Sequence, residues 1–414
     1  MKNQGLSTVI ASVIIQLTLG VIYIWSVFQT GIAETIFEGD NAQAGLIMSL
    51  VIAFMCIGCI PGGRVALKYG TRRAVFIGGL IMGLGFFLAS FIRTPEFSWA
   101  LWLTYGVMGG FGMGFCYSTT ISCAQKWYPH KKGMISGIIV FGLGIGGVLF
   151  TPIVRHVIEN FGGVGEGGEQ AAFLVLAAAF LVVCSVGSFF LKDAPDGWMQ
   201  DAVDAKAKAN AKPVAKNYTT TEMLKSPQFY LVTLTFIFAV LGGVMFANYV
   251  MQIAEARGFV REIAAAGVMA VTISNSLGRL FWGTISDKLG TANTLMVILG
   301  ITAALMWLFP VVAGFWNFVL FAAVGFAYGG ILSTFPAHTA NTFGSKYMTA
   351  NYGYVLQGLG IGSIVATTIG GHFRNIAVAG DNINLMFPAF IIASVACIAG
   401  IFLILTVNKM NKRV

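Results

Sequence analysis

The amino-acid sequence predicts an all-α membrane protein, with twelve transmembrane helices arranged as two pseudo-symmetric bundles of six. The prediction rests on the apolar composition, on the number of long apolar stretches and on an internal repeat. Hydrophobic residues make up 57% of the 414 positions and charged residues only 10%, and the mean hydropathy is +0.81. So little polar surface cannot cover a soluble globule, and much of the chain must therefore face lipid.

A helix needs about 20 mainly apolar residues to cross a bilayer. The first such stretch holds polar residues such as Gln16 and Gln29 and lacks a small-residue cleavage pattern, so we interpret it as a retained span and not as a signal peptide. The twelve stretches lie at residues 6–30, 42–66, 74–93, 97–124, 133–154, 170–191, 228–254, 263–285, 292–312, 315–341, 349–371 and 384–407.

Lysine and arginine are distributed unequally between alternate loops. One side receives eighteen of them, including those near both termini, and the other side receives only five: Arg93, Arg155, Arg257, Arg261 and Arg374. Cytoplasmic loops are enriched in these residues, so both termini are expected in the cytoplasm. The charges are scattered over short loops, which is not the pattern of a nucleic-acid-binding surface.

The organisation expected is an N-terminal six-helix bundle at 1–191, a cytoplasmic linker at 192–226 and a C-terminal six-helix bundle at 227–414. Part of 198–211 within the linker is predicted to form a short amphipathic helix.

Three short matches between the two halves indicate a duplication. Gly63, Gly70 and Thr71 recur as Gly283, Gly290 and Thr291; GFCY at 114–117 recurs as GFAY at 325–328; and GLGIGG at 142–147 recurs as GLGIGS at 358–363. Two repeated bundles predict a substrate cavity at their interface near the bilayer midplane, as in a carrier that works by alternating access.

Arg279 is the residue on which the functional prediction depends. It lies eight residues before Asp287, the first acid beyond the eighth span, which places it roughly 12 Å inside the membrane at about 1.5 Å per residue. A charge near mid-depth costs about 2.5–3.5 kcal/mol, and the sixteen acidic residues all fall in loops or at span ends. We therefore expect the compensating anion to arrive with the substrate.

A planar guanidinium suits a carboxylate bound through two hydrogen bonds. Asn275, one turn earlier on the same helix face, is expected to bond the anion or to hold the guanidinium. With a single deep cation, a monocarboxylate is favoured over a dianion. The competing interpretation is structural: Arg279 bonds main-chain carbonyls at a broken helix or reaches along the helix to water.

Several uncharged residues inside spans complete the predicted substrate site. Tyr117 and Tyr328, equivalent in the repeat, should point inward because a phenol in lipid needs a hydrogen-bond partner. Their hydroxyls are expected either to contact the substrate or to brace neighbouring helices, and the sequence favours neither interpretation. The apolar wall is predicted to contain Phe28, Leu143, Phe335 and Leu359.

The loop GTISDKLG at 283–290 resembles the cytoplasmic signature of the major facilitator superfamily, whose fold has twelve helices in two domains. Its counterpart, GRVALKYG at 63–70, has Leu67 where that signature has aspartate. Further segments are similar to the oxalate/formate antiporter group and the related monocarboxylate transporters: GVIYIWSVF at 20–28, KWYPHKKGMISG at 126–137, EMLKSPQFY at 222–230 and NYGYVLQGLG at 351–360. The resemblance implies that Arg279 binds substrate carboxylate.

Two departures from these relatives bear on the substrate. Oxalate carriers have a lysine in the eleventh span, where this chain has Gly358, Leu359 and Gly360. Animal-type monocarboxylate carriers have an aspartate at the position of Asn275. We therefore expect a bacterial inner-membrane carrier of lactate, pyruvate or formate, with L-lactate favoured. Proton symport is what the resemblance implies, and the candidate proton sites are His338, Glu255, Asp287 and Glu34.

Two alternatives stay open: an oxalate/formate-type carboxylate antiporter and, less favoured, a membrane sensor. We expect no enzyme, because no nucleophile–base pair or phosphate loop occurs. No metal or other cofactor is expected: the six cysteines fall inside spans, and Cys56 and Cys59 lack a second ligand pair. The duplication provides a cavity within one chain, so a monomer is expected.

Overall fold

The computed structural model describes residues 2–195, 198 and 216–411. The segment 198–211, for which a short amphipathic helix is predicted, lies outside the described residues except for Trp198. The described residues form α-helices with a few short 3-10 and π segments, and they contain no strand. The predicted all-α fold is confirmed.

The chain divides into two compact units. Unit 1 comprises Met1–Pro129, Gly142–Val214 and Tyr347–Tyr354, and unit 2 comprises His130–Phe141, Ala215–Lys346 and Val355–Val414. Each unit therefore includes a short segment from the other half of the sequence. A division of the chain into two consecutive bundles does not include this exchange of segments.

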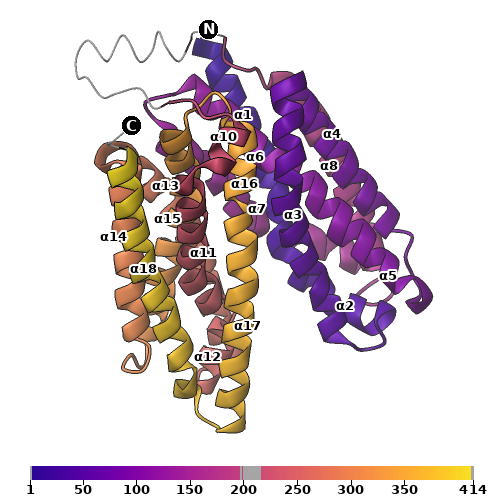
Figure 1. The fold of residues 1–414 in the computed structure, drawn as a ribbon. Coiled ribbons are helices and arrows are strands. Elements are labelled where there is room, and N and C mark those ends of the chain that lie inside the picture. Colours follow the sequence, from indigo (N-terminus) through magenta and orange to yellow (C-terminus); the bar gives the residue numbers. More distant parts are fainter. Residues whose placement is uncertain (1, 196–197, 199–215, 412–414) are drawn as a thin grey trace. The chain divides into compact units, whose positions relative to one another are not determined.

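Unit 1 is built from long helices that run roughly side by side (Figure 1). The helix α3 packs along α6, and α4 packs along α8. A 3-10 turn, η1 (Gly20–Ile24), joins α1 to α2, and a π-helical segment, η3 (Trp102–Gly109), joins α5 to α6. The helices are α1 (Lys2–Leu19), α2 (Trp25–Ile36), α3 (Asn41–Tyr69), α4 (Thr71–Ala89), α5 (Ser98–Leu101), α6 (Gly110–Trp127), most of α7 (Lys132–Asn160), α8 (Gly168–Phe190) and most of α16 (Met348–Val355).

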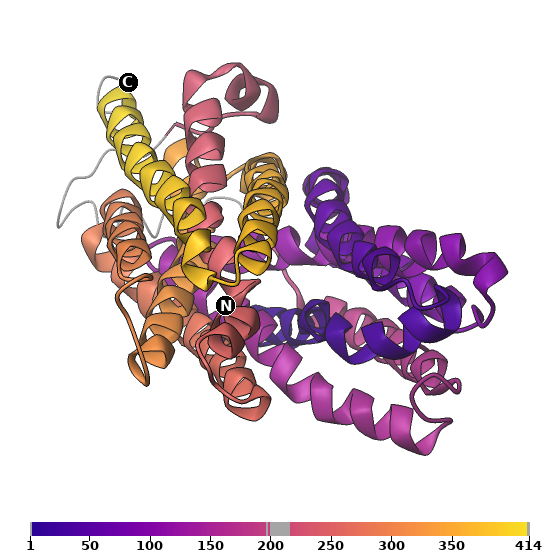
Figure 2. The same ribbon diagram turned by 90° about the horizontal axis from the view of Figure 1, so that it is seen from below.

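Unit 2 has a corresponding set of long helices, seen end-on in Figure 2. The helix α13 packs along α15, and α11 packs against both α17 and α18. Its core contains the aromatic side chains of Phe246, Phe309, Phe321 and Phe390. The helices are α10 (Thr220–Lys225), α11 (Pro227–Ala247), α12 (Val250–Ala256), α13 (Arg261–Leu289), α14 (Thr291–Trp307), α15 (Trp316–Phe343), α17 (Gln357–Ala379) and α18 (Phe387–Asn411).

The expected spans correspond to these helices. Ten helical runs among the described residues are long and apolar enough to cross a membrane, and α14 is a shorter apolar helix of 17 residues. The remaining expected span, 97–124, is divided among α5, η3 and α6. The chain is thus a multi-pass membrane protein.

Glycines of the repeated motifs pack equivalently in the two units. In unit 1, a Cβ on Gly146 would overlap the main-chain oxygen of Leu17 on α1. In unit 2, the equivalent Gly362 would place a Cβ 2.9 Å from the main-chain oxygen of Ile237 on α11. Small residues allow helix backbones to approach closely in a membrane, so the repeated sequences mark repeated helix contacts.

Candidate functional site

Arg279 lies within α13 in unit 2 and is 1% exposed. Its Nε and Nη2 donate to Oδ1 of Asn275 at 3.1 and 2.7 Å, and its Nη1 donates to the main-chain oxygen of Val140 at 2.7 Å. The helical spacing of four residues puts Asn275 directly beside the guanidinium. These two acceptors are neutral oxygens, and they orient the guanidinium.

Glycines bring the neighbouring helices close enough for these contacts. Gly137 on α7 lies against Arg279, where a Cβ would overlap the main-chain oxygen, and a Cβ on Gly283 would lie 2.5 Å from the oxygen of Gly133. On another side of α13, a Cβ on Gly329 of α15 would overlap the main-chain oxygen of Asn275. The backbone of the site is therefore fixed by direct helix contacts with α7 and α15.

Asp287, one of the four expected proton sites, lies where α7 begins. Its Oδ1 accepts from the main-chain nitrogen of Gly133 and its Oδ2 from that of Met134, both at 2.8 Å. A carboxylate at a helix N-terminus is stabilised by the orphan N–H groups and by the helix dipole. In this structure Asp287 therefore joins α13 to the first turn of α7.

The other three expected proton sites have different surroundings. His338 on α15 is 3% exposed, and its Nδ1 lies 3.2 Å from Oγ1 of Thr291. Glu34 and Glu255 are exposed. Of the three, only His338 is enclosed by the helices of its unit.

Besides Asn275, three of the predicted substrate contacts lie in unit 2 with Arg279. The ring of Phe335 stacks on Phe236 of α11 at a centroid distance of 3.9 Å. Tyr328 packs against Gly243, also on α11, and Leu359 on α17 is 7% exposed. In the structure, Phe335 and Tyr328 on α15 both pack against α11.

The predicted contacts in unit 1 are deeply buried. Phe28 is fully enclosed in an aromatic cluster with Tyr105 and Phe173, at centroid distances of 6.3 and 4.9 Å. Tyr117 is 1% exposed, and its main-chain oxygen accepts from Nε2 of Gln16 at 3.0 Å. Leu143 packs its main chain against Gly20 at the start of η1.

Sequence reasoning missed the role of the segment Tyr347–Tyr354 in unit 1. Ser122 and Thr349 share a hydrogen bond of 2.5 Å, and Gly63 lies against the main-chain oxygen of Thr349. The guanidinium of Arg64 donates to the hydroxyl of Tyr354. Gly63 and Gly283, paired in the repeat, thus each contact the beginning of a helix from the other half of the sequence. The pairing of Gly63 with Gly283 in the internal repeat is the sequence signal that could have indicated this contact.

Comparison with known proteins agrees with this architecture. The oxalate:formate antiporter of Oxalobacter formigenes is 26% identical over 382 residues, covering 89% of this chain and 86% of that protein. Monocarboxylate transporter 12 of Rattus norvegicus is 26% identical over 348 residues, covering 78% and 70%. An uncharacterized MFS-type transporter of Escherichia coli (strain K12), YhjX, is 28% identical over 360 residues, covering 86% and 85%.

A solved structure and a family model complete the comparison. The proton:xylose symporter XylE has the same fold, with a TM-score of 0.72 at 14% identity over 97% of this chain and 95% of that one. The model of the Major Facilitator Superfamily matches residues 6–367. Since the match covers most of the sequence and the helical architecture agrees with it, the chain belongs to the major facilitator superfamily of transporters.

Proposed function

We propose that the chain is a secondary active transporter of a small monocarboxylate, with L-lactate favoured and pyruvate or formate as further substrates. Arg279 binds the substrate carboxylate, and alternating access carries the complex across the membrane. The observation that carries this proposal is a guanidinium buried within the long helix α13 and oriented by hydrogen bonds to the oxygens of Asn275 and Val140.

The geometry supports a carboxylate ligand. Oδ1 of Asn275 accepts from the edge of the guanidinium formed by Nε and Nη2. A carboxylate bound through two hydrogen bonds would use the edge formed by Nη1 and Nη2, replacing the carbonyl of Val140 as the acceptor at Nη1. The substrate would exchange a neutral acceptor for a charged one, a stronger interaction in a site without bulk water.

The number of buried cations favours one carboxylate over two. Arg279 is the only lysine or arginine that is buried among the described residues. A dianion would bring a second negative charge, and the described residues offer no second buried lysine or arginine to pair with it. An unpaired charge is unfavourable in the membrane interior. The related proteins support the substrate class, because they include a carrier named for oxalate and formate and a monocarboxylate transporter.

Proton coupling belongs to the same proposal. Co-transport of a proton with the anion keeps the transported unit neutral. Proton symport is also what the resemblance to monocarboxylate carriers implies. The proposed location is a bacterial inner membrane. The strong bias of lysine and arginine toward one set of loops supports an orientation with both termini in the cytoplasm.

Replacement of Arg279 tests the proposal. In proteoliposomes, Arg279→Gln should lower the uptake rate of L-lactate at sub-saturating concentration about 30-fold or more, since loss of one partner of a buried charge pair costs about 2–5 kcal/mol. The matched control, Arg155→Gln, removes an exposed arginine and should transport normally. Lactate uptake by the Arg279→Gln protein at the wild-type rate would overturn the proposal.

A further inference from the structure

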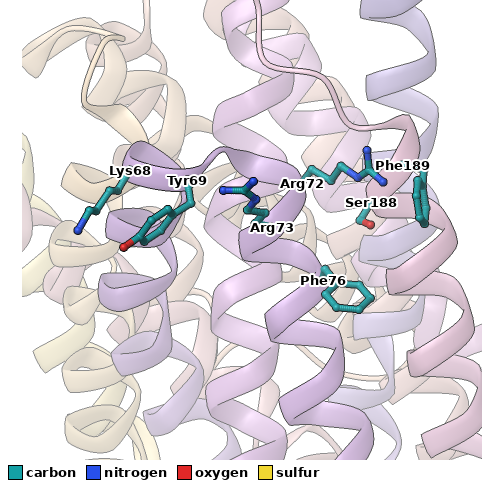
Figure 3. Close-up of a pocket in the computed structure, with 7 residues that line it drawn as sticks. All are labelled: Lys68, Tyr69, Arg72, Arg73, Phe76, Ser188 and Phe189. Carbon is teal, nitrogen blue, oxygen red and sulfur yellow. The ribbon is translucent and has the colours of Figure 1, made fainter.

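A second group of cations lies at the surface of unit 1, where α3 ends and α4 begins, beside the end of α8. The side chains surround a pocket of about 650 Å³, shown in Figure 3. Arg72 points toward Phe189, with Arg73 on the same turn of α4 and Phe76 further along that helix. The lining residues are Lys68, Tyr69, Arg72, Arg73, Phe76, Ser188 and Phe189.

Two of the three cations of this pocket lie close to aromatic rings. The guanidinium of Arg72 lies 3.9 Å from the ring centroid of Phe189, and the ammonium of Lys68 lies 5.0 Å from that of Tyr69. Cation–π contacts leave the charge able to attract an anion, because a ring carries no net charge. The cations are exposed, so a ligand can reach them.

The nearby acid, Asp193, is engaged elsewhere. Its carboxylate accepts from the main-chain nitrogen of Thr71 at 3.0 Å and from the hydroxyl of Thr71 at 2.6 Å. Leu67 stands at the position where the signature loop of the other half has Asp287. The pocket therefore has a local excess of positive charge.

Below the cations, the same two helices present apolar side chains outward. On α4 these are Phe76, Leu80 and Leu84, which are 40%, 42% and 48% exposed and recur every fourth residue. On α8, Val182 and Val186 are exposed as well. A stripe of this kind on two packed helices faces lipid in a membrane protein.

We infer that this pocket binds the phosphate headgroup of an anionic phospholipid, with the acyl chains lying along the apolar stripe of α4 and α8. The bias of basic residues assigns the loop to the cytoplasmic side, where anionic lipids attract clustered lysine and arginine. Aromatic residues at the headgroup level are typical of the membrane interface. A soluble phosphate would satisfy the cations alone, whereas a phospholipid also matches the apolar surface beneath them. The site is separate from Arg279 and independent of the substrate proposed for it.

Lipid titration of the purified full chain in detergent tests the inference. Energy transfer from tryptophan to dansyl-labelled phosphatidylglycerol should report saturable binding. The double variant Arg72→Gln/Arg73→Gln should weaken it about 30-fold, from about 1 kcal/mol per basic residue. The charge-retaining variant Arg72→Lys/Arg73→Lys should keep most of the affinity. The control Arg93→Gln/Arg155→Gln, which removes two exposed arginines assigned to the other side, should bind as wild type.

Three results would overturn the inference: equal binding of dansyl-labelled phosphatidylcholine, an equal loss in the Arg93/Arg155 control, or displacement of the labelled lipid by millimolar inorganic phosphate, which would point to a soluble anion. Thermal unfolding in lipid-free detergent checks that the double variant is folded. If it is not, the single variant Arg73→Gln should still weaken binding about fivefold, and wild-type affinity in that variant would also overturn the inference.

Discussion

Asn275 determines how the guanidinium of Arg279 is presented. A single amide oxygen accepts two of its N–H groups, which fixes the plane of the guanidinium relative to α13. A planar group held in this way loses little conformational freedom when a carboxylate binds. The residue at position 275 should therefore affect substrate affinity as well as local order.

Replacing Asn275 by aspartate should place a resident anion beside Arg279. The new carboxylate would neutralise the guanidinium and compete with substrate, so the KM for lactate should rise about tenfold or more at neutral pH, without a lower thermal stability. Initial rates in proteoliposomes and thermal unfolding in detergent provide the two measurements.

The matched control is Asn293→Asp, at an exposed position on α14. It should leave the KM unchanged. An unchanged KM in the Asn275→Asp protein would show that the amide has no part in presenting the guanidinium.

At the scale of the elements, the first turns of α7 provide a contact on which the site depends. Gly133 and Gly137, one turn apart, lie against α13 at Gly283 and Arg279. The carboxylate of Asp287 holds the same turns through Gly133 and Met134. Leu67, its counterpart in the repeat, is 39% exposed and has no carboxylate to offer, so the two halves differ at this position.

A bulky side chain at position 137 should separate α7 from α13. Gly137→Leu would force a Cβ into the main-chain oxygen of Arg279, and overpacking of this kind costs about 1–3 kcal/mol. We expect a lower midpoint of thermal unfolding in detergent and weaker lactate uptake, because the carbonyl of Val140 would move away from Nη1.

Gly300 on α14 supplies the control for this substitution. A Cβ there meets no atom within 4 Å, so Gly300→Leu should unfold and transport as wild type. Equal midpoints for Gly137→Leu and Gly300→Leu would contradict the close helix contact.

At the scale of the whole molecule, some of the close glycine contacts of one unit recur in the other. Gly114 of α6 lies against the main-chain oxygen of Met55 on α3, and Gly325 of α15 lies against that of Val271 on α13. These are the positions of the motifs GFCY and GFAY. A duplicated bundle of this kind is the usual construction of carriers that work by alternating access.

The proposed symport predicts that the whole chain moves a proton with each lactate. Addition of lactate to proteoliposomes should acidify the lumen, as measured by an enclosed pH dye, and preloaded oxalate should not accelerate lactate entry. Acceleration by oxalate, without a change of pH in the lumen, would instead favour the oxalate/formate-type antiporter.

The sequence alone determined the membrane environment, the all-α fold and the internal duplication. These properties depend on composition and on local sequence patterns, and neither depends on how the helices pack against one another. It also singled out Arg279 and Asn275, because a charge inside an apolar stretch and a neighbour four residues away on the same helix face are both local features. Their role in binding stays a prediction.

The tertiary structure decided the contacts between residues far apart in the sequence. Val140 reaches Arg279 only because Gly137 and Gly283 let two helices approach, and Phe28, expected in the substrate wall, lies in an aromatic cluster with Tyr105 and Phe173. Hydropathy predicts that a residue is buried, but it does not predict which residues contact it, because these contacts depend on how the helices pack. For the same reason the pocket formed by α3, α4 and α8 appears only when the chain is folded.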